Sequence, residues 1–154
     1  MNFTLSQEQA LLRDSVGRFV TEVCSVERHR RLANTEAGYD PSVWQQFADL
    51  GWVGIPFAEA LGGIGGSAAD VMVFCEALGR GLVREPFLPP VITCGALLRL
   101  GGSEQQQASL IPAIIDGSSQ WAFAFAESTS GYDLAMVGCE ASLTPQGYSL
   151  TGSK

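Results

Sequence analysis

The chain is short of charge. Charged residues make up 16% of its 154 residues, below the quarter that is usual in soluble proteins. Hydrophobic residues reach 46%, which supplies ample apolar material for a core and argues against long disordered stretches. The length of 154 residues suffices for one folded domain, or for one domain and part of a second.

Positive charge is especially scarce, and the formal net charge is −7. Binding to nucleic acid phosphates depends on clustered Lys and Arg, so no nucleic-acid partner is expected. The one basic cluster consists of Arg28, His29, Arg30 and Arg31. We interpret it as a solvated helix end, where cations favour the helix dipole; a local phosphate contact is the alternative.

Long apolar runs are missing too. No uninterrupted stretch reaches the roughly 18 apolar residues of a membrane-spanning helix, so no membrane span is expected. The opening MNFTLSQEQALLRD has neither the basic start nor the apolar segment of a secretory signal.

Histidine occurs once, as His29, and the four cysteines form no C-x-x-C motif. A zinc site is therefore not expected. Three of the cysteines lie in helical apolar patterns, which predicts buried free thiols and fits a reducing cytoplasm.

Capping signals and helical apolar periodicity predict a helical region up to residue 117. The expected helices run over residues 6–30, 40–50, 67–79 and 91–100, and from 103 onward, where Pro112 is expected to kink or split the last of them. Residues 52–56 are predicted to be extended. The glycine-dense segment 57–66 is interpreted as a flexible turn rather than a phosphate loop, because no G-x-G-x-x-G or G-K-[ST] motif is present.

The pattern of hydrophobic residues changes at Gly117. Trp121, Phe123 and Phe125 alternate with alanines, which is typical of a strand. Residues 136–142 and 148–151 are predicted to form two further strands on either side of a turn. The expected domains are therefore a helical one over 1–117 and the beginning of a β domain over 118–154. So few strands are not stable alone, so we expect either a fragment or a sheet that another chain completes.

Short phrases along the whole chain resemble those of one family. They are FTLSQEQ (3–9), LGWVGIP followed by LGGIG (50–65), EALGR (76–80), GSEQQ through LIP to Gly117, AFAESTSGYD (124–133) and GYSLTGSK (147–154). In this order and spacing they resemble acyl-CoA dehydrogenases. The fifth phrase stands where that family has its T-E-P-x-x-G-S-D signature.

The resemblance implies a fold and a chemistry. A complete family member has a helical, a β-barrel and a second helical domain, so this chain is expected to be mainly α, with an N-terminal helical bundle followed by an incomplete β-barrel domain. FAD lies between the last two domains. It takes a hydride from the β carbon of an acyl-CoA thioester, while a carboxylate base in the last domain takes the α proton. That base is expected outside this chain, so no catalytic residue is assigned.

The resemblance also assigns the flavin contacts. They are Phe123, Phe125, Ala126, Gly131 and Tyr132, with backbone groups of Phe125 and Ala126 at the polar edge of the flavin ring and Gly131 allowing close approach. The pattern alone favours an ordinary barrel strand with a tight turn.

The signature departs from the family pattern. Ala126 replaces a threonine, Ser128 a proline and Tyr132 a serine. Losing one hydrogen bond costs about 0.5–1.5 kcal/mol, so Ala126 alone need not abolish flavin binding, but a tyrosine at 132 reshapes or blocks the site. Glu127 and Asp133 are expected to orient the loop and cap its turn rather than to act as acid or base.

Ile92, Thr93 and Ala96 are assigned to the acyl channel by the resemblance, with ordinary helix packing as the alternative. The expected partners are an acyl-CoA substrate, an electron-accepting flavoprotein and further subunits, like or unlike. The leading interpretation is a flavin-dependent oxidoreductase chain. The alternatives are a non-catalytic partner subunit and a helical interaction module.

Overall fold

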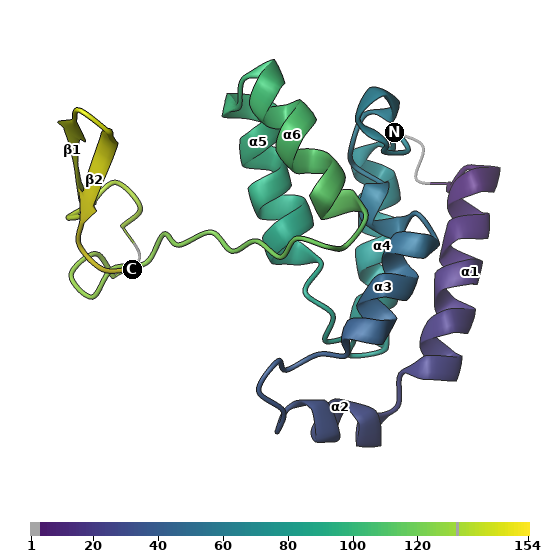
Figure 1. Cartoon of the computed structure of the whole chain (residues 1–154). Coiled ribbons are helices and arrows are strands. Elements are labelled where there is room, and N and C mark those ends of the chain that lie inside the picture. Colours follow the sequence, from purple (N-terminus) through teal and green to yellow (C-terminus); the bar gives the residue numbers. More distant parts are fainter. Residues whose placement is uncertain (1–3, 132) are drawn as a thin grey trace. The chain divides into compact units, whose positions relative to one another are not determined.

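The computed structural model describes residues 4–131 and 133–154. The chain divides into two compact units, a helical one that ends at Ala122 and a smaller one that spans Phe123–Lys154 (Figure 1). The mainly helical fold class, with an incomplete β part, is therefore confirmed.

Six α-helices form the first unit over its described residues. They are α1 (Gln7–Val23), α2 (Val26–Leu32), α3 (Pro41–Asp49), α4 (Ala68–Arg80), α5 (Gly95–Gly101) and α6 (Glu104–Ile115). Short 3₁₀ turns, η1 (Trp52–Gly54) and η2 (Glu59–Leu61), and a π-helical segment, η3 (Leu88–Cys94), connect them. The predicted capping boxes at Ser6, Ser67 and Ser103 are all present, and Asp40 caps α3.

The first predicted helix is in fact two. α1 ends at Val23, and Cys24 is extended, with φ −105° and ψ 106°. The Ser25 side chain then accepts a hydrogen bond from the Arg28 amide at 3.0 Å and starts α2. A serine offers the backbone this local alternative to a continuous helix, and the break allows Arg28 and Leu32 to be buried.

The segment after α3 is a turn, so the prediction of extended chain over 52–56 was wrong. Gly51 has a left-handed φ of 75° and is followed by η1. The turn buries Trp52, Val53 and Ile55 together, which a strand with alternating sides does not do.

The structure refines two predictions about prolines. Pro89 and Pro90 lie in the first turn of η3, where a missing N–H breaks no helical bond, so the fourth helical segment begins at Leu88 and not at Val91. α6 continues through Pro112 without splitting. Pro112 and Ala108 are both exposed, so the carbonyl that loses its helical partner is open to water.

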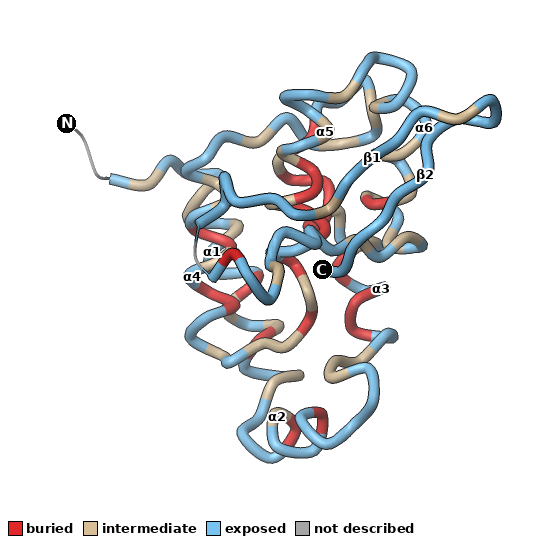
Figure 2. Tube along the Cα trace, turned by 90° about the vertical axis from the view of Figure 1, so that its left-hand side faces the viewer, coloured by how far each residue is buried: buried red, intermediate tan, exposed pale blue. Residues whose placement is uncertain are grey.

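Aromatic side chains form the centre of the helical unit. Phe47 has its ring centroid 5.3 Å from that of Trp52, 5.9 Å from that of Phe74 and 5.7 Å from that of Phe19, each in an edge-to-face arrangement. This cluster joins α1, α3, η1 and α4. α1 packs along α4 (Figure 1), and Figure 2 marks the buried positions of α1, α3 and α4 in red.

The glycine-dense loop is tightly packed, so its interpretation as a flexible turn was wrong. The amides of Gly63, Gly65 and Gly66 donate to carbonyls of Ala58, Phe57 and Ile55 at 3.1, 2.7 and 2.7 Å. A Cβ atom at Gly63 would overlap the Phe57 carbonyl. Glycine at 63 is therefore a packing requirement.

The second unit contains one two-stranded antiparallel sheet among its described residues. β1 (Glu140–Thr144) and β2 (Gly147–Thr151) pair from Glu140 with Thr151 to Thr144 with Gly147. The return strand is confirmed, whereas β1 starts later than the predicted strand over 136–142. Residues 121–125 form no strand, because a strand needs a neighbouring backbone to bond to and the described residues offer none there.

The hairpin has one apolar and one polar face. Ala141, Leu143, Tyr148 and Leu150 share a face by the pairing register, and all are exposed. A single hairpin with an uncovered apolar face is characteristic of an incomplete β domain.

We expect Gly63→Ala to lower the free energy of unfolding by about 1–3 kcal/mol, because the added methyl overpacks the loop against the Phe57 carbonyl. Gly79→Ala is the matched control. Gly79 lies in α4 with open space around its Cβ position, so that change should raise stability by about 0.5–1 kcal/mol. Urea unfolding followed by helical circular dichroism measures both, and equal midpoints for the two variants would contradict the packing argument.

Candidate functional site

Phe123 and Phe125 form an exposed aromatic surface. Their rings stack with centroids 5.5 Å apart and an interplanar angle of 27°, and they are 45% and 48% exposed. The Phe125 amide donates to the Phe123 carbonyl at 3.0 Å. The N–H of Phe125 is therefore already used within the chain.

Unlike the Phe125 N–H, the backbone groups of Ala126 are not used within the described part of the chain. Ala126 is exposed, and its N–H and C=O make no hydrogen bond with any described residue. Gly131 is exposed with a φ of 53°, and no atom lies within 4 Å of its Cβ position. Tyr132, the remaining predicted flavin contact, lies outside the described residues.

These features fit a flavin ring. An isoalloxazine has an apolar dimethylbenzene edge and a polar pyrimidine edge, and the chain offers stacked apolar rings directly beside unbonded backbone donors and acceptors. The fit concerns the local surface of 123–131 alone.

Glu127 is held by three donors. Its Oε2 accepts from the Gly138 amide at 2.7 Å, and its Oε1 accepts from the Cys139 amide at 3.1 Å and pairs with Lys154 Nζ at 2.7 Å. The side chain is 7% exposed. Lys154 above all, and then the Gly138 amide, lower the pKa of Glu127 to about 2.

The turn after Glu127 has a second set of bonds. The buried Ser130 hydroxyl accepts from the Glu127 amide at 3.1 Å and donates to the Glu127 carbonyl at 3.2 Å. Asp133 accepts from the Ala135 amide at 2.9 Å, as in a turn capped by its side chain. Sequence reasoning placed Glu127 and Asp133 in the loop but missed Ser130, whose burial no local pattern signals.

The candidate substrate residues lie on the segment that joins η3 to α5. Ile92 and Thr93 belong to η3 and Ala96 to α5, and all three are half-buried. Ile92 also packs against the aromatic core. Their positions are open to either interpretation, channel lining or helix packing.

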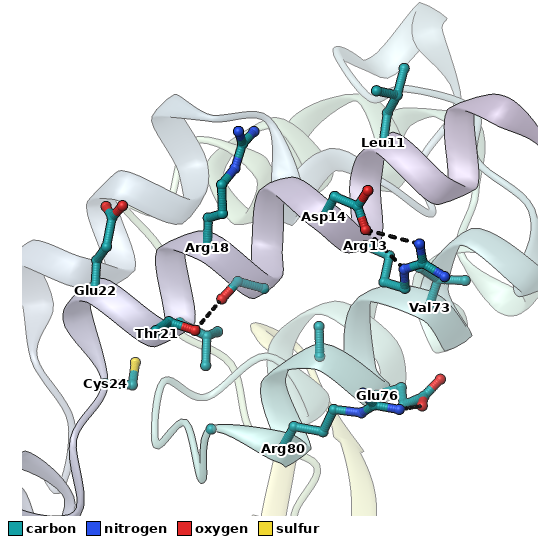
Figure 3. A pocket seen from close by; sticks show the side chains of 14 residues that line it. Leu11, Arg13, Asp14, Arg18, Thr21, Glu22, Cys24, Val73, Glu76 and Arg80 are labelled. Carbon is teal, nitrogen blue, oxygen red and sulfur yellow. Dashed lines mark hydrogen bonds and ion pairs between the residues drawn. The ribbon is translucent and has the colours of Figure 1, made fainter.

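A groove of about 1020 Å³ runs between α1 and α4. Figure 3 shows Arg13 paired with Asp14 and Arg80 paired with Glu76 along it. Both ion pairs are exposed, and Arg18 and Glu22 add one charge of each sign. Such balanced, solvated charges do not single out a ligand.

Arg28 forms a buried ion pair, so the interpretation of this residue as part of a solvated helix end was wrong. Its Nη2 lies 2.6 Å from Glu85 Oε1, which also accepts from the Asp40 amide at 3.3 Å. Burial is the largest single influence and acts to lower the pKa of Arg28, but the hydrogen bond to Glu85 together with the charges of Glu85, Cys24 and Asp40 outweighs it, so the pKa is raised. His29 contacts the Leu82 carbonyl at 3.0 Å, which leaves only the last two members of the basic cluster exposed.

The cysteines are free thiols, as predicted, but only Cys94 is buried. Burial raises the pKa of the Cys24, Cys75 and Cys94 thiols. Within residues 4–131 and 133–154, no group of three or more His, Cys, Asp or Glu side chains could hold a metal. In the same ranges no helix has the length and apolar character needed to cross a membrane.

Residues 6–118 match the family model described as acyl-CoA dehydrogenase, N-terminal domain. The helical unit thus corresponds to this N-terminal domain, and the chain belongs to the acyl-CoA dehydrogenase family.

Curated relatives agree with this assignment. The chain is 37% identical over 101 residues to acyl-CoA dehydrogenase IpdE2 of Mycolicibacterium smegmatis, covering 65% of this chain and 32% of that protein. It is 32% identical over 115 residues to acyl-CoA dehydrogenase FadE27 of Mycobacterium tuberculosis, covering 74% of this chain and 31% of that protein. The chain thus spans about a third of the length of these relatives.

Solved structures share the fold over nearly the whole chain. A G363A variant of the Tcur3481–Tcur3483 steroid ACAD superimposes with a TM-score of 0.83 at 29% identity, covering 97% of this chain and 40% of that one. The ChsE4–ChsE5 complex from Mycobacterium tuberculosis gives a TM-score of 0.84 at 22% identity, covering 99% and 39%. At that identity the second likeness concerns the fold alone.

The buried ion pair generates a stability prediction. Arg28→Met should lower the free energy of unfolding by about 3–5 kcal/mol, because Glu85 is left buried without its cation. Adding Glu85→Leu should recover most of the loss. Arg80→Met, in the exposed pair with Glu76, is the control and should cost no more than about 1 kcal/mol. Urea unfolding compares the variants, and a double variant as unstable as the single one would contradict a pairing role.

The low pKa of Glu127 generates a pH prediction. A carboxyl whose pKa is depressed on folding contributes stability that is present above its ordinary pKa of 4.5 and is lost as pH falls towards about 2. The amide NMR shifts of Gly138 and Cys139 should therefore stay constant from pH 7 to pH 4. A midpoint near 4.5 in these shifts would show that the carboxylate is not held as described.

Proposed function

We propose that this chain forms part of a flavin-dependent oxidoreductase that introduces an α,β double bond into an acyl-CoA thioester. The observation that carries the proposal is the exposed surface of Phe123, Phe125 and Ala126, in a chain whose residues 6–118 match the family's N-terminal domain. FAD, when bound, supplies the acceptor for the substrate hydride.

The chain's own part is to bind and orient. The Phe125 carbonyl and the backbone groups of Ala126 meet the polar edge of the ring, and the two phenyl rings cover apolar surface beside it. Gly131 allows the backbone to approach the ligand without a side chain in between, and Tyr132 is assigned to the same contact by its place in the signature. The catalytic base comes from another domain of the enzyme.

Ile92, Thr93 and Ala96 line the acyl channel in this proposal. Their half-buried positions on η3 and α5 leave side-chain surface available to a thioester chain. The similarity to a steroid ACAD at 29% identity favours a substrate with a bulky ring system over a simple fatty acyl chain.

The assembly we propose is an oligomer with unlike subunits. The steroid ACAD that this chain resembles pairs Tcur3481 with Tcur3483. Leu143, Tyr148 and Leu150 are exposed on the apolar face of the hairpin. A two-stranded hairpin is not stable alone, so we propose that further β structure from the same or another chain covers this face. The free thiols support a cytoplasmic location, and an electron-transferring flavoprotein is the proposed acceptor.

A second candidate is a non-catalytic subunit that supports a catalytic relative. The specific observation in its favour is the altered signature, in which Ala126 has no hydroxyl for the flavin and Tyr132 replaces a small residue. In that case the flavin surface of this chain is a remnant, and the partner holds the cofactor.

The visible spectrum of the full-length protein, purified with any partner chain, tests the proposal. We expect a visible flavin absorption band that bleaches when acyl-CoA thioesters are added without oxygen, because the ring takes up the hydride. Ile92→Trp should weaken the bleaching by filling the acyl channel, whereas Leu100→Trp, at an exposed position on α5, serves as the control. A protein that stays colourless when FAD is supplied would overturn the flavin proposal and favour a supporting subunit or an interaction module.

A further inference from the structure

Glu127 joins segments that are far apart in the sequence. Its carboxylate receives the amides of Gly138 and Cys139 and the ammonium of Lys154. A single side chain thus ties the start of the loop to the chain before β1 and to the chain after β2.

The site is built for a charged acceptor. The side chain of Glu127 is almost fully enclosed, and both of its carboxylate oxygens accept hydrogen bonds. Hydrogen bonds to an ionised acceptor are stronger than those between neutral groups. A Cβ atom at Gly138 would lie 2.9 Å from Glu127 Oε2, so glycine at 138 permits this close approach.

Ser130 closes the turn that follows Glu127. Ser130 bonds to the backbone N–H and C=O of Glu127, so the peptide groups on either side of residue 127 have a fixed direction. Ala126 is the neighbouring residue, and its backbone groups are the ones left without a partner among the described residues. The Ala126 carbonyl shares a peptide group with the Glu127 amide that bonds to Ser130, and the Glu127 carboxylate anchors this turn to Gly138, Cys139 and Lys154.

We propose that Glu127 is a positioning residue that presents the Ala126 backbone to the flavin. The inference rests on the proposed flavin-binding function. Backbone groups that are held near their bound positions before binding lose less entropy when the ligand arrives, and an N–H at the polar edge stabilises the negative charge that builds up there on reduction. Loosening the loop therefore weakens flavin binding and makes the reduction potential of the bound flavin more negative.

The test compares Glu127→Gln with Glu140→Gln in the full-length protein, purified with any partner chain. Both variants remove one negative charge from the same unit, but Glu140 is exposed on β1 and makes no hydrogen bond or ion pair with its side chain among the described residues. We expect Glu127→Gln to raise the FAD dissociation constant by about tenfold or more. A neutral amide forms no ion pair with Lys154, and its NH₂ group, which is a donor, would face a backbone N–H of Gly138 or Cys139 that needs an acceptor. Glu140→Gln should leave the constant unchanged.

The potential separates positioning from simple loss of structure. A role in folding alone lowers occupancy but leaves the potential of the flavin that remains bound unchanged, whereas the positioning role shifts it to a more negative value. If Glu127→Gln does not fold, two variants of Lys154 replace it in the test. Lys154→Arg keeps the cation and should retain the FAD affinity and the flavin potential. Lys154→Met removes the cation and should weaken binding and shift the potential in the same direction as expected for Glu127→Gln, by a smaller amount.

The outcomes are distinguishable. Wild-type protein that takes up no flavin overturns the proposed function, and this inference falls with it. Wild-type protein that binds flavin, with Glu127→Gln matching it in affinity and potential, overturns the inference alone.

Discussion

The edge-to-face packing of Phe47 against Trp52 and Phe74 is the contact on which the helical unit depends. Each ring comes from a different element, α3, η1 and α4, so none of these elements can be displaced without opening the others. Burying one such ring contributes about 1.5–3 kcal/mol, and each aromatic pair adds about 0.5–1.5 kcal/mol. The sharp turn at Gly51 exists because Trp52 has to reach this centre directly after α3 ends.

Each unit also contains an enclosed ion pair that fastens segments far apart in the sequence. Arg28 with Glu85 fastens the short helix α2 to the chain before η3, and Glu127 performs the corresponding task in the second unit. In both places a charge is enclosed and neutralised by its partner. Such pairs are sensitive to the loss of one member and so specify a geometry more than they add net stability.

Much of the helical architecture followed from local rules. Ser6, Asp40, Ser67 and Ser103 start helices as predicted, because a capping side chain bonds to an amide only a few residues away. The six phrases along the chain carried the family resemblance for a related reason, since each is contiguous and their order and spacing can be read directly from the sequence. The candidate flavin site was predicted as the segment 123–133, while the stacking of Phe123 on Phe125 was not predicted.

What the sequence by itself determined are the features that act within a few residues: the capped helix starts, the end of the helical region near Gly117, and the family to which the chain belongs. What only the tertiary structure decided are the partners across long separations. Arg28 was interpreted as solvated because Glu85 is far along the chain, the glycine loop was expected to be flexible because the Phe57 carbonyl it packs on cannot be read from glycines, and the donors to Glu127 lie at 138, 139 and 154. A pattern reports spacing along the chain, whereas burial and pairing depend on which distant groups folding brings within bonding distance.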